Sequence, residues 1–434
     1  MSDHYEAIVV GAGPAGNAAA LTLAQAGRCV LQLERAEYPG AKNPHGAILF
    51  APAMEELVAD FRSKAPLERH IVEHRIWTLD KDGHSAALAR RVGDDYAAGA
   101  AGAAGRIDAD RYTVLRSTFD AWFAGVIKEA GVRVLYGTSV ADLVRETDGR
   151  AVGVRTEAGD EFFADVVVLG DGIEAMIARR SGLRESLEPS DVALTVKEKR
   201  SMPAEMLDER FGIGRNEGVV VEAAGWFSAT ISGSGFIYTN RDSLSVGVSC
   251  LVGEIVESDI TPSELLAAFK QHPSIRSLLQ GSEVVEFAAQ LMPEGGYRVR
   301  PRLYGDGWLT CGDATQLSDA SYRHGSSLAL TSGRLAGETI AELTRHHRPM
   351  NARHLSLYRD KLERSPVLKE LRRINSLGAT HPGIADYVPA DPHALAQAAR
   401  SFGRSASADA RDRQRETLRQ FTHKSQLKLV RGTV

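Results

Sequence analysis

A short stretch near the N-terminus leaves few folds open to this chain. Residues 6–10 form an apolar run typical of a buried parallel strand. The pattern G-x-G-x-x-G follows at residues 11–16, and an alanine- and leucine-rich helix is predicted from there to about Ala26, with Gly27 ending it. A second strand is predicted over residues 29–33. Strand, glycine turn, helix and strand in this order predict a βαβ unit that begins an α/β fold.

Each glycine of this pattern has its own physical role. Gly11 allows the tight turn, Gly13 lets the backbone approach a pyrophosphate, and Gly16 lets the helix pack closely on the strand. The helix N-terminus offers free N–H groups and a partial positive charge to phosphates. Glu34, at the end of the second strand, can accept hydrogen bonds from an adenosine ribose and disfavours a 2′-phosphate. A glycine-rich turn without a ligand is the alternative, but the complete unit favours dinucleotide binding.

Two later apolar runs each lead into a glycine and an aspartate. Residues 166–169 are predicted to form a buried strand that runs into a Gly-Asp-Gly sequence centred on Asp171. Residues 308–311 show the same apolar pattern and run into Gly-Asp at Asp313. A long helix is expected to begin near Gly325. Both aspartates are therefore expected at the ends of strands.

The sequence between these two runs is different in character. Stretches rich in strand-forming residues occur at 191–198, 218–231 and 236–252. They predict a second, mainly antiparallel sheet. Ahead of them, residues 111–130 carry apolar side chains near a 3.6-residue spacing and predict a helix.

The length of 434 residues exceeds what one compact core usually contains, so two or three domains, or one large domain with insertions, are expected. We predict a discontinuous nucleotide-binding domain, a mainly antiparallel substrate domain and a helical C-terminal region. Their predicted boundaries are, in that order, residues 1–75, 106–185 and 297–345; residues 76–105 and 186–296; and residues 346–434.

Composition excludes several classes of protein. The chain has 52 Lys and Arg against 56 Asp and Glu, a net charge of −4, which argues against a dedicated nucleic-acid binder. Its three cysteines are widely scattered, so they cannot form a four-thiolate iron–sulfur or zinc site, and a disulfide framework is not expected. No metal site is predicted. Without a signal sequence or an apolar run long enough to span a membrane, the chain is expected in the cytoplasm, with no transmembrane segment.

The glycine pattern and the two strand-end aspartates together resemble a known flavoprotein fold. They are similar to the FAD-binding Rossmann-like fold of aromatic hydroxylases, glutathione-reductase-type proteins and geranylgeranyl reductases. Further stretches resemble one branch of these proteins, the FixC-type and electron-transfer-flavoprotein:quinone oxidoreductase family. These stretches are residues 40–43, 196–198, 236–240, 270–273, 293–296 and 312–336.

The resemblance implies FAD as the cofactor and assigns roles to particular residues. It implies that Asp313 accepts a hydrogen bond from the ribityl chain, that the helix from Gly325 points its N-terminus at the flavin, and that Arg116 lies against the cofactor. A turn aspartate and a surface-helix arginine are the alternatives for Asp313 and Arg116. The full set of predicted FAD-binding residues is Gly11, Gly13, Ala15, Gly16, Glu34, Arg35, Arg116, Val140, Asp171, Gly172, Asp313, Gly325 and Ser326.

The chain also departs from these relatives. Electron-transfer-flavoprotein:quinone oxidoreductases carry a C-terminal module whose cluster is held by four cysteines, and this chain lacks those cysteines. It therefore has no cluster of its own to relay electrons. Flavin-dependent halogenases share the nucleotide fingerprint, but residues 225–231 lack their two-tryptophan signature, so halogenation is not expected.

The loop at residues 42–46 supplies the predicted catalytic residues. Lys42 can stabilise an anionic flavin or a substrate oxyanion, and His45 can exchange a proton near neutral pH. Asn43 lies between them. The alternatives are that Lys42 and Asn43 only brace the loop, and that His45 is a plain loop residue or a point of flavin attachment.

These observations predict an FAD-dependent oxidoreductase that acts on a small or medium organic substrate, as a dehydrogenase or a monooxygenase. NAD(P)H is a possible transient electron donor, since no second glycine unit marks a separate domain for it. The alternative is an electron-transfer flavoprotein component that passes electrons to or from a ferredoxin-like protein or a quinone. A protein that keeps only the fold, without redox chemistry, is a third option.

Overall fold

The computed structural model describes residues 4–41, 46–80, 85–91, 110–184, 187–225, 231, 233–294, 302–316, 325–365 and 368–369. These residues divide into two compact units. The first lies within Met1–Leu67, Val114–Ala193 and Leu291–Ser376, and the second within Glu68–Thr113 and Leu194–Gln290. None of the helices within the described residues has the length and apolar composition needed to span a bilayer.

The first unit is built on a mainly parallel sheet with the order β16-β17-β10-β1-β2-β7. The four pairings from β17 to β7 are parallel, and β9 pairs antiparallel with both β8 and the start of β10. The central strands are buried apolar runs, as expected for a parallel sheet covered on both faces. The strands are β1 (His4–Val10), β2 (Val30–Leu33), β7 (Arg133–Leu135), β8 (Val140–Arg145), β9 (Ala151–Thr156), β10 (Glu161–Leu169), β16 (Tyr304–Gly305) and β17 (Trp308–Thr310).

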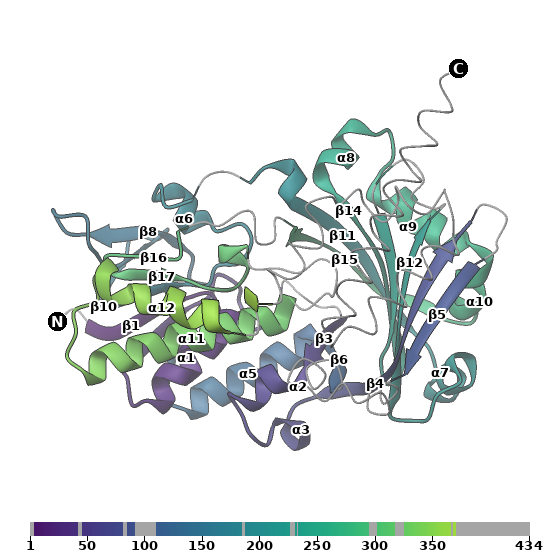
Figure 1. Cartoon of the computed structure of the whole chain (residues 1–434), viewed down its shortest axis with the longest axis horizontal. Helices are drawn as coiled ribbons and strands as arrows, with labels where there is room; N and C mark the ends of the chain where they lie inside the picture. Colours follow the sequence, from purple (N-terminus) through teal and green to yellow (C-terminus); the bar gives the residue numbers. More distant parts are fainter. Residues whose placement is uncertain are drawn as a thin grey trace, which may run out of the picture. The chain divides into compact units, whose positions relative to one another are not determined.

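Helices cover this sheet, and two of them pack very closely. A Cβ atom at Gly333 of α11 would lie 2.0 Å from the carbonyl oxygen of Ala15 in α1, so these two helices meet backbone to backbone (Figure 1). As predicted, α1 ends just before Gly27, whose φ is +73°. The helical elements of this unit are α1 (Pro14–Gln25), α2 (Ala51–Glu55), α3 (Phe61–Lys64), α5 (Arg116–Glu129), α6 (Met176–Arg180), η1 (Pro189–Asp191), η3 (Gly312–Thr315), α11 (Gly325–Arg345) and α12 (Ala352–Arg364); β3 (Gly46–Phe50) is a further strand.

The second unit is a mainly antiparallel sheet with the order β15-β11-β14-β13-β12-β4-β6, and β5 pairs with β4. The β12–β13, β13–β14 and β4–β5 pairs are antiparallel, whereas β12 and β4 run parallel. The stretch predicted at 236–252 divides between β13 and β14. The elements are β4 (Leu67–Leu79), β5 (Ser85–Arg91), β6 (Arg111–Leu115), β11 (Val192–Ser201), α7 (Ala204–Phe211), β12 (Glu217–Gly225), β13 (Gly233–Thr239), β14 (Ser243–Leu251), α8 (Val252–Glu257), α9 (Pro262–Gln271), α10 (Pro273–Leu279) and β15 (Glu283–Pro293).

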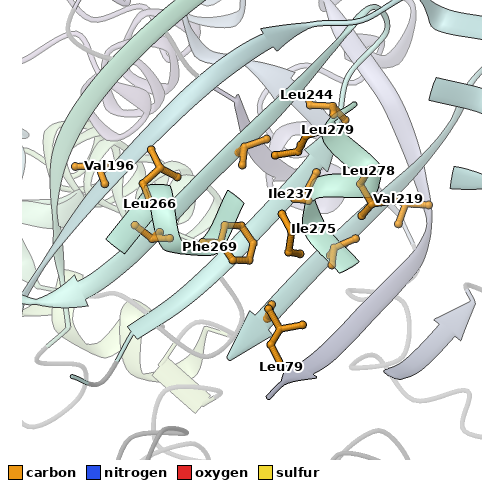
Figure 2. Packing of buried hydrophobic residues seen from close by; sticks show 14 of the residues in the cluster. Leu79, Val196, Val219, Ile237, Leu244, Leu266, Phe269, Ile275, Leu278 and Leu279 are labelled. Carbon is orange, nitrogen blue, oxygen red and sulfur yellow. The ribbon is translucent and has the colours of Figure 1, made fainter. Parts of the chain in front are cut away.

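Two helices build the core of the second unit against the sheet. Leu266 and Phe269 of α9 and Ile275 of α10 pack over strand residues such as Ile237 (Figure 2). A Cβ atom at Gly235 would lie 2.4 Å from the Phe269 ring, so this glycine makes room for the ring on the sheet. All four apolar side chains are at most 2% exposed, and burial of such side chains is worth about 1.5–3 kcal/mol each.

One secondary-structure prediction is wrong in part. The predicted helix over residues 111–130 begins only at Arg116, because residues 111–115 form strand β6. The cause is a contact far away in the sequence: the Thr113 hydroxyl lies in the sheet and donates to the carbonyl oxygen of Thr239 at 2.9 Å. Helical spacing of apolar residues cannot reveal such a partner.

Candidate functional site

The carboxyl ends of three neighbouring strands define the candidate site. Val10 of β1 is paired with Leu169 of β10, and Leu169 with Thr310 of β17, so the loops that follow them begin side by side. Open α/β sheets bind ligands outside the carboxyl ends of their strands. We name this region the strand-end site, and its loops are residues 11–16, 170–175 and 311–316.

Packing requires glycine at Gly11 and Gly16 of the first loop, whereas Gly13 lies beside open space. A Cβ atom at Gly11, whose φ is +96°, would lie 2.4 Å from the carbonyl oxygen of Gly170, and one at Gly16 would lie 2.0 Å from that of Gly11. At Gly13, an added Cβ would meet no atom of the described residues within 4 Å. The backbone at Gly13 is therefore open to an approaching ligand.

The start of α1 has the properties of an anion site. Gly13 is its N-cap residue and supplies no side chain to cap it, while Pro14 occupies the first helical position. The first N–H groups of a helix have no partner within the helix, and the helix dipole adds partial positive charge there. Ala15, in the first turn, is buried against η3, where a Cβ at Gly312 would lie 2.6 Å from the Ala15 Cβ.

Glu34, at the end of β2, fastens the glycine turn. Its carboxylate accepts a hydrogen bond from the Ala12 N–H at 2.7 Å through Oε2 and from the Ala36 N–H at 2.8 Å through Oε1. A carboxylate has about four lone-pair positions, so it can still accept a ribose hydroxyl. Glu34 thus has a structural role that the sequence did not indicate, and its predicted contact with an adenosine ribose remains a prediction.

Tyr136, just after β7, was not predicted. Its hydroxyl is buried and has no hydrogen-bond partner among the described residues. Burial raises the pKa of Tyr136, and Glu34 makes a smaller contribution in the same direction. The backbone holds the two segments together, because the Glu34 N–H donates to the carbonyl oxygen of Leu135 at 2.9 Å. The Lys128 ammonium lies 4.9 Å from the Tyr136 ring centroid. A buried hydroxyl beside Glu34 offers a further polar contact at the same end of the site.

Two predicted residues lie at the margin of the site. Arg35 is substantially exposed and forms an ion pair with Glu174 at 2.8 Å, which joins the loop after β2 to the loop after β10. Val140 begins β8, where it is half-buried and packs against the apolar core of the first unit. Arg35 can reach a ligand only from the rim, and Val140 offers an apolar surface.

Asp171 and Gly172 occupy the loop after β10. Oδ2 of Asp171 accepts the Ile177 N–H at 3.2 Å, whereas its buried Oδ1 has no partner in the part of the chain that the structure describes. Burial raises the pKa of Asp171, although the Ile177 N–H opposes this. Gly172 has a φ of +78°, which permits the turn. An unsatisfied carboxylate oxygen in a buried position is expected to receive a donor from a bound molecule.

Asp313 and Arg116 are brought close enough to interact. Burial raises the pKa of Asp313 to about 6, against the lowering influence of Arg116 and Arg184. The Arg116 side chain is only 11% exposed and makes two hydrogen bonds to Asp120, at 2.9 and 2.8 Å. The alternative that Arg116 is a solvated surface arginine is therefore wrong.

The remaining predicted residues are placed as follows. Gly325 and Ser326 are the first residues of α11, and both are half-buried. Lys42, Asn43 and His45 lie outside the described residues, so their predicted catalytic roles remain predictions.

Gly40, two residues ahead of Lys42, has a defined neighbour. A Cβ atom at Gly40 would lie 2.9 Å from the Cα of Ser117, so the chain passes close to the start of α5.

Comparison with known proteins assigns the class of this chain. Residues 6–178 match the family model for FAD dependent oxidoreductases. The chain is 44% identical to Protein FixC of Azorhizobium caulinodans over 97% of its own length and 95% of that protein, and 44% identical to Protein FixC of Bradyrhizobium diazoefficiens over the same shares. It is 35% identical to an Escherichia coli protein named Probable electron transfer flavoprotein-quinone oxidoreductase YgcN, over 87% of this chain and 86% of that protein.

The strand-end site and the matched model thus define an FAD-dependent oxidoreductase. Within that class, the extent of the FixC matches means that the chain belongs to the FixC family. Both the family predicted from the sequence and the class of enzyme are confirmed.

Solved structures with low sequence identity share the fold of this chain. A geranylgeranyl bacteriochlorophyll reductase-like protein from Thermoplasma acidophilum has a TM-score of 0.71 at 17% identity, with 94% of each chain covered. The flavin-dependent brominase Bmp2 has a TM-score of 0.66 at 20% identity, with 96% of this chain and all of the brominase chain covered. These likenesses, together with the two sheets, confirm the predicted fold class.

The strand-end site fits the FAD that the family implies. It offers an uncapped helix N-terminus for a diphosphate, open space above Gly13, and an acceptor for ribose hydroxyls at Glu34. It also offers the buried Oδ1 of Asp171, which has no partner among the described residues. Gly11 and Gly16 cannot carry side chains, so the turn keeps the shape that lets a phosphate reach the backbone.

Proposed function

We propose that this chain is an electron-transfer oxidoreductase that passes electrons between FAD in the strand-end site and an external carrier, either a quinone or a ferredoxin-like protein. One observation carries the proposal: the identity to FixC extends over 97% of this chain, and the identity to the protein named YgcN over 87% of it. A small organic substrate, which the sequence favoured, has no comparable support.

The residues that would hold FAD belong to the strand-end site. The diphosphate would lie at Gly13 and the start of α1, the adenosine ribose at Glu34, and the ribityl chain at Asp313. Gly325 and Ser326 begin the helix that the family resemblance assigns to the flavin. Bound FAD would supply the exchange of electrons between donors and acceptors.

The protein's own groups would control charge at this site. Arg116 is held in place by Asp120 and keeps positive charge near Asp313, which favours an anionic neighbour. The N-terminus of α11 adds partial positive charge. Hydrogen bonds within the protein hold Arg116, so it need not reorganise when charge on a bound cofactor changes.

The cysteine inventory supports an external carrier. The three cysteines of this chain cannot supply the four thiolates of an iron–sulfur cluster. Cys29 is exposed, while Cys250 and Cys311 are buried, and burial raises the pKa of both buried thiols, to about 11 and about 12. Electrons that leave the FAD would then reach the carrier without an iron–sulfur cluster of this chain between them.

The proposal is tested by choosing the acceptor. The purified protein is photoreduced without oxygen and mixed in separate reactions with a short-chain quinone, with an oxidised ferredoxin-like protein, and with oxygen. The oxidised protein is mixed separately with a reduced ferredoxin-like protein and with NAD(P)H. We expect the quinone or the ferredoxin-like protein to exchange electrons much faster than oxygen does, and NAD(P)H to reduce the protein slowly. Rapid NAD(P)H consumption that requires a small organic substrate would contradict the proposal and indicate a monooxygenase.

A further inference from the structure

We propose that Arg184 is a positioning residue for cofactor binding, which holds the loops carrying Asp171 and Asp313 in the arrangement that receives FAD. This inference rests on the assignment of FAD to the strand-end site. Nothing in the sequence around Arg184 singles it out, because it follows α6 in a short stretch without a recognisable pattern.

The guanidinium of Arg184 connects two loops that are distant in the sequence. Its Nη1 donates to Ile173 O at 3.1 Å and to Ala314 O at 3.2 Å. Ile173 lies two residues after Asp171, and Ala314 directly follows Asp313. One side chain therefore ties together the two loops that carry these aspartates beyond the paired strand ends.

The backbone holds Arg184 in place. The N–H groups of Leu183 and Arg184 both donate to Ala178 O, at 2.7 and 3.1 Å, which fastens this segment to the end of α6. Arg184 is only 9% exposed. The surrounding fold therefore fixes the position of the guanidinium, which is not that of a mobile surface side chain.

Arg184 also has bonding capacity that the described residues do not use. Its Nη2 and the Oδ1 of Asp171 are both buried, and neither has a hydrogen-bond partner in the part of the chain that the structure describes. Leaving buried charged groups partly unsatisfied is costly, and such violations concentrate at functional sites. Asp171 borders the glycine turn, since a Cβ at Gly11 would lie 3.4 Å from the Asp171 N.

The charge of Arg184 also acts on Asp313. Burial raises the pKa of Asp313 to about 6, and only Arg116 and Arg184 oppose that rise. Burial lowers the pKa of Arg184 itself, against the opposing influence of Asp171. Removing Arg184 would leave Arg116 as the one cation acting on Asp313 within the described residues.

Two further arginines act on this cluster, Arg35 on Asp171 and Arg179 on Arg184, but neither is among the groups that lower the pKa of Asp313. The remaining groups around the cluster do not replace the charge of Arg184 either. Cys311 interacts with Asp171, and Tyr358 of α12 with Cys311; both are buried, and burial raises the pKa of each. The helices α1 and α11 present Ala15 and Ser332 to the η3 turn, and neither residue titrates in the range concerned. Without Arg184, Asp313 is therefore expected to take up a proton at higher pH.

The test compares Arg184→Gln and Arg184→Lys with Arg180→Gln, a matched control in α6 whose side chain is 47% exposed. The FAD dissociation constant and the thermal unfolding of the apoprotein are measured from about pH 5 to about pH 8. For Arg184→Gln we expect a dissociation constant roughly 10- to 100-fold higher at neutral pH, and a loss of affinity on acidification that begins at higher pH than in the wild type. Arg184→Lys should keep the wild-type pH profile, because it keeps the charge, and lose about tenfold in affinity, because an ammonium cannot reproduce the fork of donors.

The outcomes are distinct. Arg184→Gln with the affinity and pH profile of the Arg180→Gln control would overturn the inference. If Arg184→Gln does not fold, Arg184→Lys decides, and wild-type affinity in that variant would overturn it. A wild-type protein that binds FAD but fails to transfer electrons to any carrier would contradict the proposed function and leave this inference standing.

Discussion

Substitution of alanine at two glycines of the same turn should separate the fold of this site from its ligand binding. At Gly16, the added Cβ would lie 2.0 Å from the Gly11 carbonyl oxygen, at least 1.0 Å closer than the 3.0 Å limit of real contacts. Both partners are backbone, so neither can rotate away. At Gly13, the same methyl meets nothing within 4 Å among the described residues, and its backbone angles (φ −77°, ψ 179°) suit any residue.

The expected magnitudes differ accordingly. Gly16→Ala should destabilise the apoprotein by about 3 kcal/mol, the upper end of overpacking costs, which corresponds to about 6–12 °C in the unfolding temperature. Gly13→Ala should leave that temperature unchanged. It should instead raise the FAD dissociation constant roughly 10- to 150-fold, because the methyl group keeps a phosphate from hydrogen bonds worth about 1.5–3 kcal/mol.

The assay uses the apoprotein of each variant. Thermal unfolding is followed by calorimetry without FAD, and affinity is measured by titrating FAD and following its fluorescence. The reasoning would be refuted by Gly13→Ala protein that binds FAD like the wild type, or by Gly16→Ala apoprotein with wild-type stability.

Three further predictions follow from individual side chains. Asp313→Asn should stabilise the apoprotein at pH 7 by about 1–3 kcal/mol and weaken FAD binding, as measured in paired unfolding and titration experiments. Burial raises the pKa of Asp313 to about 6, so its ionised form lowers the stability of the folded protein above that pH. This loss of stability disappears as the pH falls toward 4. Arg69→Met should destabilise the protein by about 3–5 kcal/mol in calorimetry, because the fully buried Arg69 guanidinium bonds to Asp208 at 2.5 Å and to the carbonyl of Asn240 at 2.6 Å; wild-type stability would contradict it. Glu34→Ala should weaken FAD binding by about 1.5–3 kcal/mol, and an unchanged titration would remove Glu34 from the site.

The parts of this fold that the sequence predicted are those encoded locally. The βαβ unit at the N-terminus depends on glycines whose neighbours lie within a few residues, and Gly16 and Gly11 do meet as the pattern requires. Asp313 was found because an apolar run directly precedes it.

What the sequence did not predict depends on partners that are far away along the chain. Arg184 joins residues near 173 and 314, and no local pattern records a pair of carbonyl groups more than a hundred residues apart. Tyr136 is a site candidate only because β7 pairs with β2, which carries it toward Glu34. Residues 111–115 form strand β6 and not the predicted helix, because the hydrogen-bond partner of Thr113 lies in another strand.

The central claim is that the strand-end site holds FAD without a covalent bond. Heat or acid precipitation of the purified protein, followed by identification of the flavin in the supernatant and its quantity per chain, tests this most directly. We predict about one FAD per chain, released in full, since hydrogen bonds and packing alone hold it. Flavin that stays with the pellet, or a protein that binds no FAD when it is added, would contradict the claim.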